Sequence, residues 1–428
     1  MARAGGRATV ASRATTRPPG GRGAGALRTR LPGRTATAAL TVGVEEEFVL
    51  IDPATSKAAL AAPELLRLLD GAPWAKQELM RFQFETTTKI CTRLDEVRRE
   101  LTRHRQVVAS AAEQLGCRLV ASGTAPYGTP GLAGLTDTPR YRELARRFAP
   151  LVAEAGTCAC HVHVGVPSRD LGVQVLTRLR AWLPQLLAIS ANSPIAHGRD
   201  TGWQSWRYRL WSRWPTARPP GVWPDAAAYD ATVRRLIRHG AALDPPSIYF
   251  HARLSPRYPT IEVRIADVCL EVDDAVLLAG LVRALVATAI VEARRGLPVE
   301  PASTRRVTAA ISAAARHGLC GPGLDPLTGE AVTHHRLIDR LIDRVHPALE
   351  LSEDADEIQT LLRRLDEHGT GAAHQRALWI QARSADEFAK ALARVTRNEP
   401  VRSWTDARAW PDGLLPDSLI PEAHRCSG

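Results

Sequence analysis

Two histidines stand two residues apart inside a short apolar run, CACHVHVGVP (158–167). The alternation of this run is typical of a β-strand, on which His161 and His163 would share one face and the valines the other. Two neighbouring imidazoles could bind a metal ion or a phosphate. They could equally be partly buried histidines satisfied by hydrogen bonds, and this stretch alone leaves both interpretations open.

Three consecutive glutamates stand in a second strand-like run, VGVEEEF (42–48). This arrangement is costly, because strands disfavour Glu and like charges repel each other. Glu45 and Glu47 would share one face, whereas Glu46 would point the other way with the apolar residues. A solvated edge strand would tolerate the charges, but the apolar VLI that follows favours a buried strand.

Charged residues interrupt apolar, strand-like runs at two further places along the chain. RFQFETTT (81–88) places Glu85 after two phenylalanines, and TIEVRIADVC (260–269) places Glu262 and Arg264 opposite an apolar face. Buried carboxylates need cations or hydrogen-bond donors. Oxygen-rich sites with few imidazoles suit Mg²⁺ or Mn²⁺ rather than structural zinc, and a neighbouring arginine suits a phosphate. Together these groups indicate phosphoryl transfer from a nucleotide.

Periodicity and end signals predict the elements that must position these residues. The predicted strands cover 41–52, 81–88, 117–123, 158–167, 247–254 and 260–266. The predicted helices cover 94–116, 139–149, 168–192 with Ser168 as N-cap, 272–295, and the last third of the chain, 302–397. Without regular βαβ alternation, this order predicts an α+β fold with an antiparallel or mixed sheet. No GxxxxGK[ST] loop is present, so an ATP site would have to be built on that sheet.

The charge distribution divides the chain. The formal net charge is +11, but residues 1–38 hold eight arginines and no acid, which leaves only three net positive charges for the rest. We predict a disordered Arg/Ala/Gly-rich extension at 1–38, a single catalytic domain at 39–400 and a C-terminal tail at 401–428. The extension could instead be a misassigned start, a transit peptide or a nucleic-acid-binding tail.

Cysteine usage and hydropathy suggest a compartment. The seven cysteines are scattered without a CxxC pair, and no secretory signal precedes them, which fits a reducing cytoplasm. The most apolar stretch, 275–291, is interrupted by Arg283 and is predicted to be a buried helix rather than a membrane span. We therefore expect a cytoplasmic protein without a membrane partner.

A tryptophan- and arginine-rich segment occupies residues 197–224, with five of the ten tryptophans. Interleaved aromatic and arginine side chains can stack on nucleic-acid bases. They can also pack a long loop into a lid or a pocket wall. We favour the pocket wall.

The chain resembles the carboxylate–amine ligase family that is related to type 2 glutamate–cysteine ligases. The resemblance rests on segments between about 42 and 390, namely VGVEEEF (42–48), ASGTAPY (121–127), CACHVHVGVP (158–167), GRDTGWQSWRYRLWSRWPTA (198–217), RLSPRYPTIEVRIADVCLEVDDAVLLAGLVRALV (253–286), AARHGL (314–319) and GTGAAHQR (369–376). It implies an antiparallel sheet curled into a funnel, with helices packed outside. It also implies ATP-dependent amide formation, in which a carboxylate takes the γ-phosphate and an amine displaces phosphate from the acyl phosphate.

The resemblance also implies roles for single residues. It gives a metal site to Glu45, Glu47, Glu85, His161 and Glu262. It gives nucleotide binding to His161, His163 and Arg264, and catalysis to Arg264 and Glu85. Candidates to hold a substrate carboxylate are Arg199, Arg207 and Arg253, for which pairing with surface acids is an equal alternative. Glu46 occupies a position where an apolar residue is also acceptable, and is predicted to be no more than a neighbour.

We therefore expect an ATP- and Mg²⁺- (or Mn²⁺-) dependent carboxylate–amine ligase of small molecules, with glutamate and cysteine as the first candidate substrates. The alternatives are a metal-dependent hydrolase that uses the His161–His163 strand and a basic nucleic-acid-binding protein. No HExxH motif accompanies the histidine pair, and nucleic-acid binding leaves the buried glutamates unexplained. We expect no nucleic-acid partner, and a homo-oligomer is the default assembly.

Overall fold

The computed structural model describes residues 40–299 and 302–399. Contacts group the described residues into one compact unit. The predicted extension at 1–38 and the predicted tail at 401–428 lie outside the described residues. All predicted site residues fall inside the described part.

A seven-stranded antiparallel sheet holds the site strands side by side, in the order β2-β3-β1-β5-β9-β8, with β4 paired to β1. Its strands are Val42–Ile51 (β1), Ala75–Gln77 (β2), Gln83–Thr87 (β3), Arg118–Val120 (β4), Cys160–Gly165 (β5), Ala252–Leu254 (β8) and Thr260–Val263 (β9). Among the described residues, β2 and β8 do not pair with each other, so the sheet is open. The predicted α+β class with an antiparallel sheet is confirmed.

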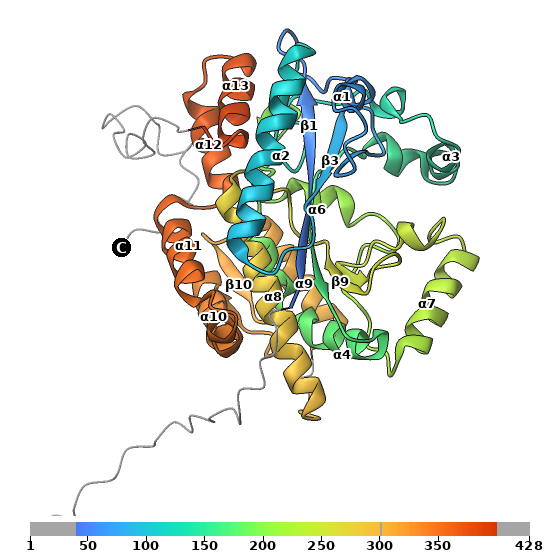
Figure 1. Ribbon diagram of the computed structural model, residues 1–428, viewed down its shortest axis with the longest axis vertical. Coiled ribbons are helices and arrows are strands. Elements are labelled where there is room, and N and C mark those ends of the chain that lie inside the picture. Colours follow the sequence, from blue (N-terminus) through green and yellow to red (C-terminus); the bar gives the residue numbers. More distant parts are fainter. Residues whose placement is uncertain (1–39, 300–301, 400–428) are drawn as a thin grey trace, which may run out of the picture. The chain divides into compact units, whose positions relative to one another are not determined.

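The helices pack outside this sheet, as predicted (Figure 1). They are Ala62–Leu68 (α1), Leu94–Gln114 (α2), Pro139–Ala153 (α3), Arg169–Leu179 (α4), Leu183–Ser190 (α5), Trp206–Trp211 (α6), Ala226–Arg238 (α7), Val272–Arg294 (α8), Thr304–His317 (α9), His334–Leu351 (α10), Ala355–His368 (α11), Gly371–Gln381 (α12) and Ala385–Thr396 (α13). In Figure 1, α2 and α8 run beside β1, with α10 to α13 beyond them.

Helix α8 is the centre of the helical layer. It packs against α2, α4, α10 and α11 as well as against strands β1 and β5. By length and composition it could cross a membrane, but 83% of its most apolar window is buried inside the protein. The predicted buried helix is therefore confirmed, since core helices that are surrounded by other elements are apolar on all sides.

Strand β1 has two different faces. One face of its first seven residues is buried and carries Val42, Val44, Glu46 and Phe48. The other face is partly exposed and carries Gly43, Glu45 and Glu47. This alternation sends the first and third glutamates of the EEE run to one face, as a two-residue strand period requires.

Two local predictions were wrong. The strand predicted at 247–254 forms only over Ala252–Leu254, because Pro245 and Pro246 begin a 3₁₀ turn and have no N–H to donate to a sheet. The predicted all-helical last third contains a hairpin, Pro322–Leu324 (β10) with Ala331–Thr333 (β11), around a DPLTGE turn.

Candidate active site

Strand register places the predicted site residues opposite one another in a row across the sheet. The paired positions are Glu47 with Glu85, Glu45 with His161, His163 with Glu262, and Glu262 with Arg253. Directly opposed side chains on one face of an antiparallel pair lie close together. Residues up to about 200 positions apart in the chain therefore meet in one place.

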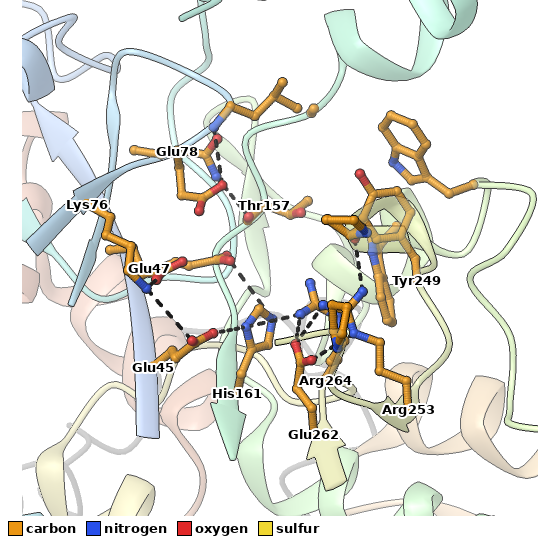
Figure 2. A pocket seen from close by; sticks show the side chains of 18 of the residues that line it. Glu45, Glu47, Lys76, Glu78, Thr157, His161, Tyr249, Arg253, Glu262 and Arg264 are labelled. Carbon is orange, nitrogen blue, oxygen red and sulfur yellow. Dashed lines mark hydrogen bonds and ion pairs between the residues drawn. The ribbon is translucent and has the colours of Figure 1, made fainter. Parts of the chain in front are cut away.

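These side chains line a pocket with a volume of ≈ 380 Å³. Figure 2 shows Glu45, Glu47 and Glu78 on one side of His161, and Glu262 with Arg253 and Arg264 on the other. Aromatic residues Trp211, Trp214, Tyr249 and Tyr258 complete the wall. The tryptophan- and arginine-rich segment thus contributes to this wall through α6 and the turn after it.

The first carboxylate group consists of Glu45, His161 and Glu262, which offer ligand atoms within 4.8 Å of one another. His161 Nδ1 lies 3.2 Å from Glu45 Oε2 and 3.5 Å from Arg264 Nη1. Burial, and then the charge of Arg264, lowers the pKa of His161 to about 3. The imidazole is therefore neutral near pH 7 and keeps a lone pair for a cation.

The two glutamates of this group stay ionised for different reasons. Burial alone would raise the pKa of Glu45, but hydrogen bonds with His161 and His163, together with the charge of His163, hold it well below its usual value. Burial likewise opposes ionisation of Glu262, but Arg264 and Arg253 together lower its pKa. Opposite charges at contact distance outweigh desolvation in both cases.

The second carboxylate group consists of Glu47, Glu78 and Glu85, again with ligand atoms within 4.8 Å of one another. Burial, and then the charge of Glu85, raises the pKa of Glu47 to about 7. Burial with the charges of Glu85 and Glu47 raises the pKa of Glu78 well above its usual value. The Lys76 ammonium lies 2.8 Å from Glu85 Oε1 and 4.0 Å from Glu45 Oε1.

The donor sets of both groups fit a hard divalent cation. They contain five carboxylates and one imidazole, which suits Mg²⁺ or Mn²⁺. The raised pKa of Glu47 and of Glu78 reflects burial first and then the negative charge of the neighbouring carboxylates. A cation among these oxygens would remove the repulsion.

His163 faces the seam between β5 and β9. Its Nδ1 is 3.0 Å from Thr260 Oγ1, and its Nε2 is 3.6 Å from Glu45 Oε1. Burial opposes its charge, but the hydrogen bond with Glu45 and the charge of Glu262 raise its pKa. Tyr258 meets its ring edge to face, with centroids 6.2 Å apart.

Two charged residues that belong to or contact the second carboxylate group were missed by the sequence analysis. Lys76 lies on β2 and Glu78 directly follows it, so both reach the pocket from the edge of the sheet. Their segment, AKQE, has the composition of an ordinary exposed turn, and all three residues of β2 are half-buried. The one usable signal is that both residues have the same strand parity, which places them on one face.

Of the four predicted arginines, Arg264 and Arg253 both line the pocket but differ in their hydrogen-bond partners. Arg264 lines the pocket, pairs with Glu262, and has a buried Nε without a partner. Arg253 is fully engaged, because it forms a fork with Glu262 at 2.7 and 3.0 Å and also donates to two backbone carbonyls. In this structure Arg253 therefore holds Glu262 in place.

The other two predicted arginines differ in location, since Arg207 lines the pocket and Arg199 does not. Arg207 is buried, lines the pocket, and donates to the carbonyls of Ile265 and Arg264 at 3.0 and 3.1 Å. Its Nε has no partner. Arg199 is exposed on the two-residue strand Arg199–Asp200 (β7) and does not line the pocket, so the structure does not bring it to the other site residues.

Comparison with protein families gives one description. A model of glutamate-cysteine ligase family 2 (GCS2) matches residues 41–396. The "Putative glutamate--cysteine ligase 2-1" of Saccharopolyspora erythraea is 42% identical over 348 residues, which cover 81% of this chain and 92% of that protein. The "Putative glutamate--cysteine ligase 2" of Salinispora tropica is 43% identical over 344 residues, or 79% and 90% of the two chains.

Solved structures share the fold. The glutamate–cysteine ligase of Francisella tularensis in complex with AMP matches with a TM-score of 0.62 at 13% identity, over 90% of this chain and 92% of that one. A bifunctional glutathione synthetase from Pasteurella multocida matches with a TM-score of 0.62 at 12% identity, over 84% and 52%. At these identities the likeness concerns the fold alone.

Proposed function

Because the chain belongs to glutamate-cysteine ligase family 2 and is a ligase enzyme, we propose that it uses ATP to join a carboxylate to an amine. The observation that carries this proposal is the row of opposed residues across the sheet. The two groups that contain the five carboxylates and His161 line one pocket together with the guanidinium of Arg264, which supports the proposal. Phosphoryl transfer needs this combination.

We propose that Glu45, His161 and Glu262 hold one Mg²⁺ or Mn²⁺ ion and that Glu47, Glu78 and Glu85 hold another. When bound, such ions neutralise phosphate oxygens and help to orient them for in-line transfer. Arg264 would contact the transferring phosphoryl group, and His161 and His163 would bind the nucleotide phosphates. Arg253 keeps Glu262 ionised and oriented through its two-point hydrogen bond.

The proposed reaction has two steps. A substrate carboxylate oxygen attacks the γ-phosphorus of ATP, the bond to the β,γ-bridging oxygen breaks, and ADP leaves. The amine nitrogen then attacks the acyl carbon, phosphate leaves, and the nitrogen loses a proton to give the amide. Of the three arginines predicted to hold the substrate carboxylate, Arg207 is buried, lines the pocket and has an uncommitted Nε–H.

Glutamate and cysteine are the first substrate pair to test, because the similar proteins carry that name. We propose that the reaction takes place in the cytoplasm, where ATP is available. Five cysteines of the described part are free and buried, which agrees with a reducing compartment: Cys91, Cys117, Cys158, Cys160 and Cys269.

ADP release tests the reaction class. Purified protein with ATP and Mg²⁺ is offered a panel of amino-acid pairs that includes glutamate with cysteine. ADP formation that requires both a carboxylate and an amine supports the proposal and identifies the pair. AMP formation would indicate an acyl-adenylate route, and ATP turnover without an amine would indicate a hydrolase.

Hydroxylamine trapping tests the acyl phosphate. With the active carboxylate, ATP and hydroxylamine in place of the amine, the enzyme should form one hydroxamate per ADP. ADP without hydroxamate would contradict an acyl phosphate that is open to an amine. Glu367→Gln, which changes an exposed acid on α11, provides a control with wild-type yield.

A further inference from the structure

Glu46, the middle residue of the EEE run, forms a buried ion pair on the other face of the sheet. Both Glu46 and Arg105 of α2 are 0% exposed. Arg105 Nε donates to Glu46 Oε2 at 3.0 Å, and Nη2 donates to Oε1 at 2.5 Å. This two-point geometry fixes both the distance and the orientation of the carboxylate.

Arg105 is itself held by two other segments. It donates to the carbonyls of Leu270 and Cys269, both at 2.8 Å, and to that of Thr396 at 3.5 Å. Its guanidinium also lies 5.6 Å from the centroid of the Phe48 ring. The arginine therefore ties β1 to α2, to the end of α13, and to the segment that follows β9, the strand that carries Glu262.

A role in stability alone explains this pair poorly. Two buried charges gain little net free energy over apolar residues of similar size, because desolvation offsets their attraction. The apolar neighbours Val44 and Phe48 already bury this face of β1. What a charge pair adds is specificity, since a strand that slips by one residue moves every side chain to the opposite face.

We propose that the Glu46–Arg105 pair positions the active site by fixing the register of β1 in the sheet and its distance from α2. Its flanking residues, Glu45 and Glu47, belong to two different carboxylate groups, so the backbone of Glu46 is the link between them. A slip of one residue would carry Glu46 into the pocket and the two ligands into the apolar layer. The inference rests on the proposed function, because it assumes that these groups bind cations.

The test compares three variants. Glu46→Gln removes the charge but keeps the shape, and Glu46→Leu with Arg105→Leu replaces the pair by apolar side chains. The matched control is Asp354→Asn, which breaks another buried pair, Arg283–Asp354, between α8 and the start of α11 and outside the pocket lining. The measurements are Mn²⁺ affinity by electron paramagnetic resonance, the unfolding temperature, and amide hydrogen exchange of β1.

Glu46→Gln should weaken Mn²⁺ binding by about tenfold to a hundredfold in the folded protein, the range found when groups that orient metal ligands are lost. The double variant should recover most of the unfolding temperature but not the affinity. Asp354→Asn should lower the unfolding temperature and leave the affinity unchanged. Wild-type affinity in both Glu46 variants would overturn the positioning role.

Hydrogen exchange separates this proposal from the proposed function. If the wild-type protein binds no Mn²⁺, the cation sites fail, but positioning is still decided by the exchange of residues 42–51. Both Glu46 variants should then exchange β1 amides at least about tenfold faster than wild type, whereas Asp354→Asn should not. Unchanged β1 exchange in both variants would show that the apolar contacts alone fix the strand.

Discussion

Glutamates of this pocket reach different protonation states because their neighbours differ. Glu262 lies between two arginines and stays ionised, whereas Glu47 and Glu78 share a crowded corner with Glu85 and have raised pKa values. One corner is thus satisfied by protein charges, and the other carries charge that a bound cation would balance. The residues that complete each corner decide its chemistry as much as the acids themselves do.

Glu78→Gln tests the residue that the sequence analysis missed. Removing one carboxylate from the second group should weaken Mn²⁺ binding at least about tenfold and lower turnover, because the ion loses an anionic ligand. Titration calorimetry with Mn²⁺ and ADP-release rates measure the two effects. Glu367→Gln serves as the exposed control, and equal behaviour of the two variants would remove Glu78 from the site.

Arg253→Lys tests the support of Glu262. A lysine cannot reproduce a fork to Glu262 together with two bonds to backbone carbonyls. We expect turnover to fall about tenfold to a hundredfold and the free energy of unfolding to fall by about 1–3 kcal/mol. The matched control is Arg376→Lys, which alters a similar fork to Asp200 outside the pocket. Equal loss of turnover in both variants would contradict a role specific to the site.

At the scale of single residues, the sequence could predict the site residues that are charged or polar within an otherwise apolar strand pattern. The EEE run, the paired histidines and the charged TIEVR strand stand out because charges interrupt apolar alternation. Lys76 and Glu78 give no such signal, because charged residues are ordinary in and beside a short edge strand that is half-buried and polar. Arg199 was proposed from composition alone, which carries no distance information, and its exposed strand lies apart from the pocket lining.

At the scale of elements, register turns five separate strands into one site. Each strand was predictable from its own alternation, but the pairing of β1 with both β3 and β5 joins distant segments. No local signal states which residue of one strand faces which residue of another. The short β10–β11 hairpin and the shortened β8 were missed because their local turns compete with longer apparent patterns.

The GTGAAHQR motif (369–376) has a packing explanation at the same scale. Gln375 Nε2 donates to Asn192 Oδ1 at 2.7 Å, and Asn192 Nδ2 donates to the carbonyls of Ala121 and Val268. The Asn192 backbone N–H donates in turn to Asp267, whose carboxylate lies 3.7 Å from Arg207 Nη1. Helix α12 therefore supports the arginine wall of the pocket from behind.

Gly371→Ala tests this packing. An added Cβ would stand 2.6 Å from Asn192 Oδ1, and the hydrogen bonds of Asn192 prevent it from moving aside. We expect the free energy of unfolding to fall by about 1–3 kcal/mol, the usual cost of overpacking. Urea unfolding measures it, with Gly43→Ala as control because its Cβ would meet only Thr88 Oγ1 at 3.9 Å. An unchanged midpoint would show that α12 can shift freely.

At the scale of the whole molecule, histidines buried away from the site link stability to pH. His104 stacks on Trp74 with ring centroids 4.3 Å apart, and His334 is 0% exposed. Neither ring nitrogen of either residue has a hydrogen-bond partner. Burial lowers the pKa of each to about 4, against 6.5 in the unfolded chain. Between these pH values the unfolded chain binds more protons, so the free energy of unfolding falls as the pH falls.

The double variant His104→Phe with His334→Leu should flatten this dependence. Between pH 7 and pH 5, each histidine is expected to lower the free energy of unfolding by about 1–2 kcal/mol. The reason is that the histidine binds a proton in the unfolded chain but stays neutral in the folded protein. Urea unfolding at the two pH values measures the difference for wild type and variant. His335→Leu alters the adjacent histidine, whose side chain is 53% exposed, and should keep the wild-type slope. If the double variant also kept that slope, acid sensitivity would have to come from the pocket, and the pH dependence would then change when Mn²⁺ is added.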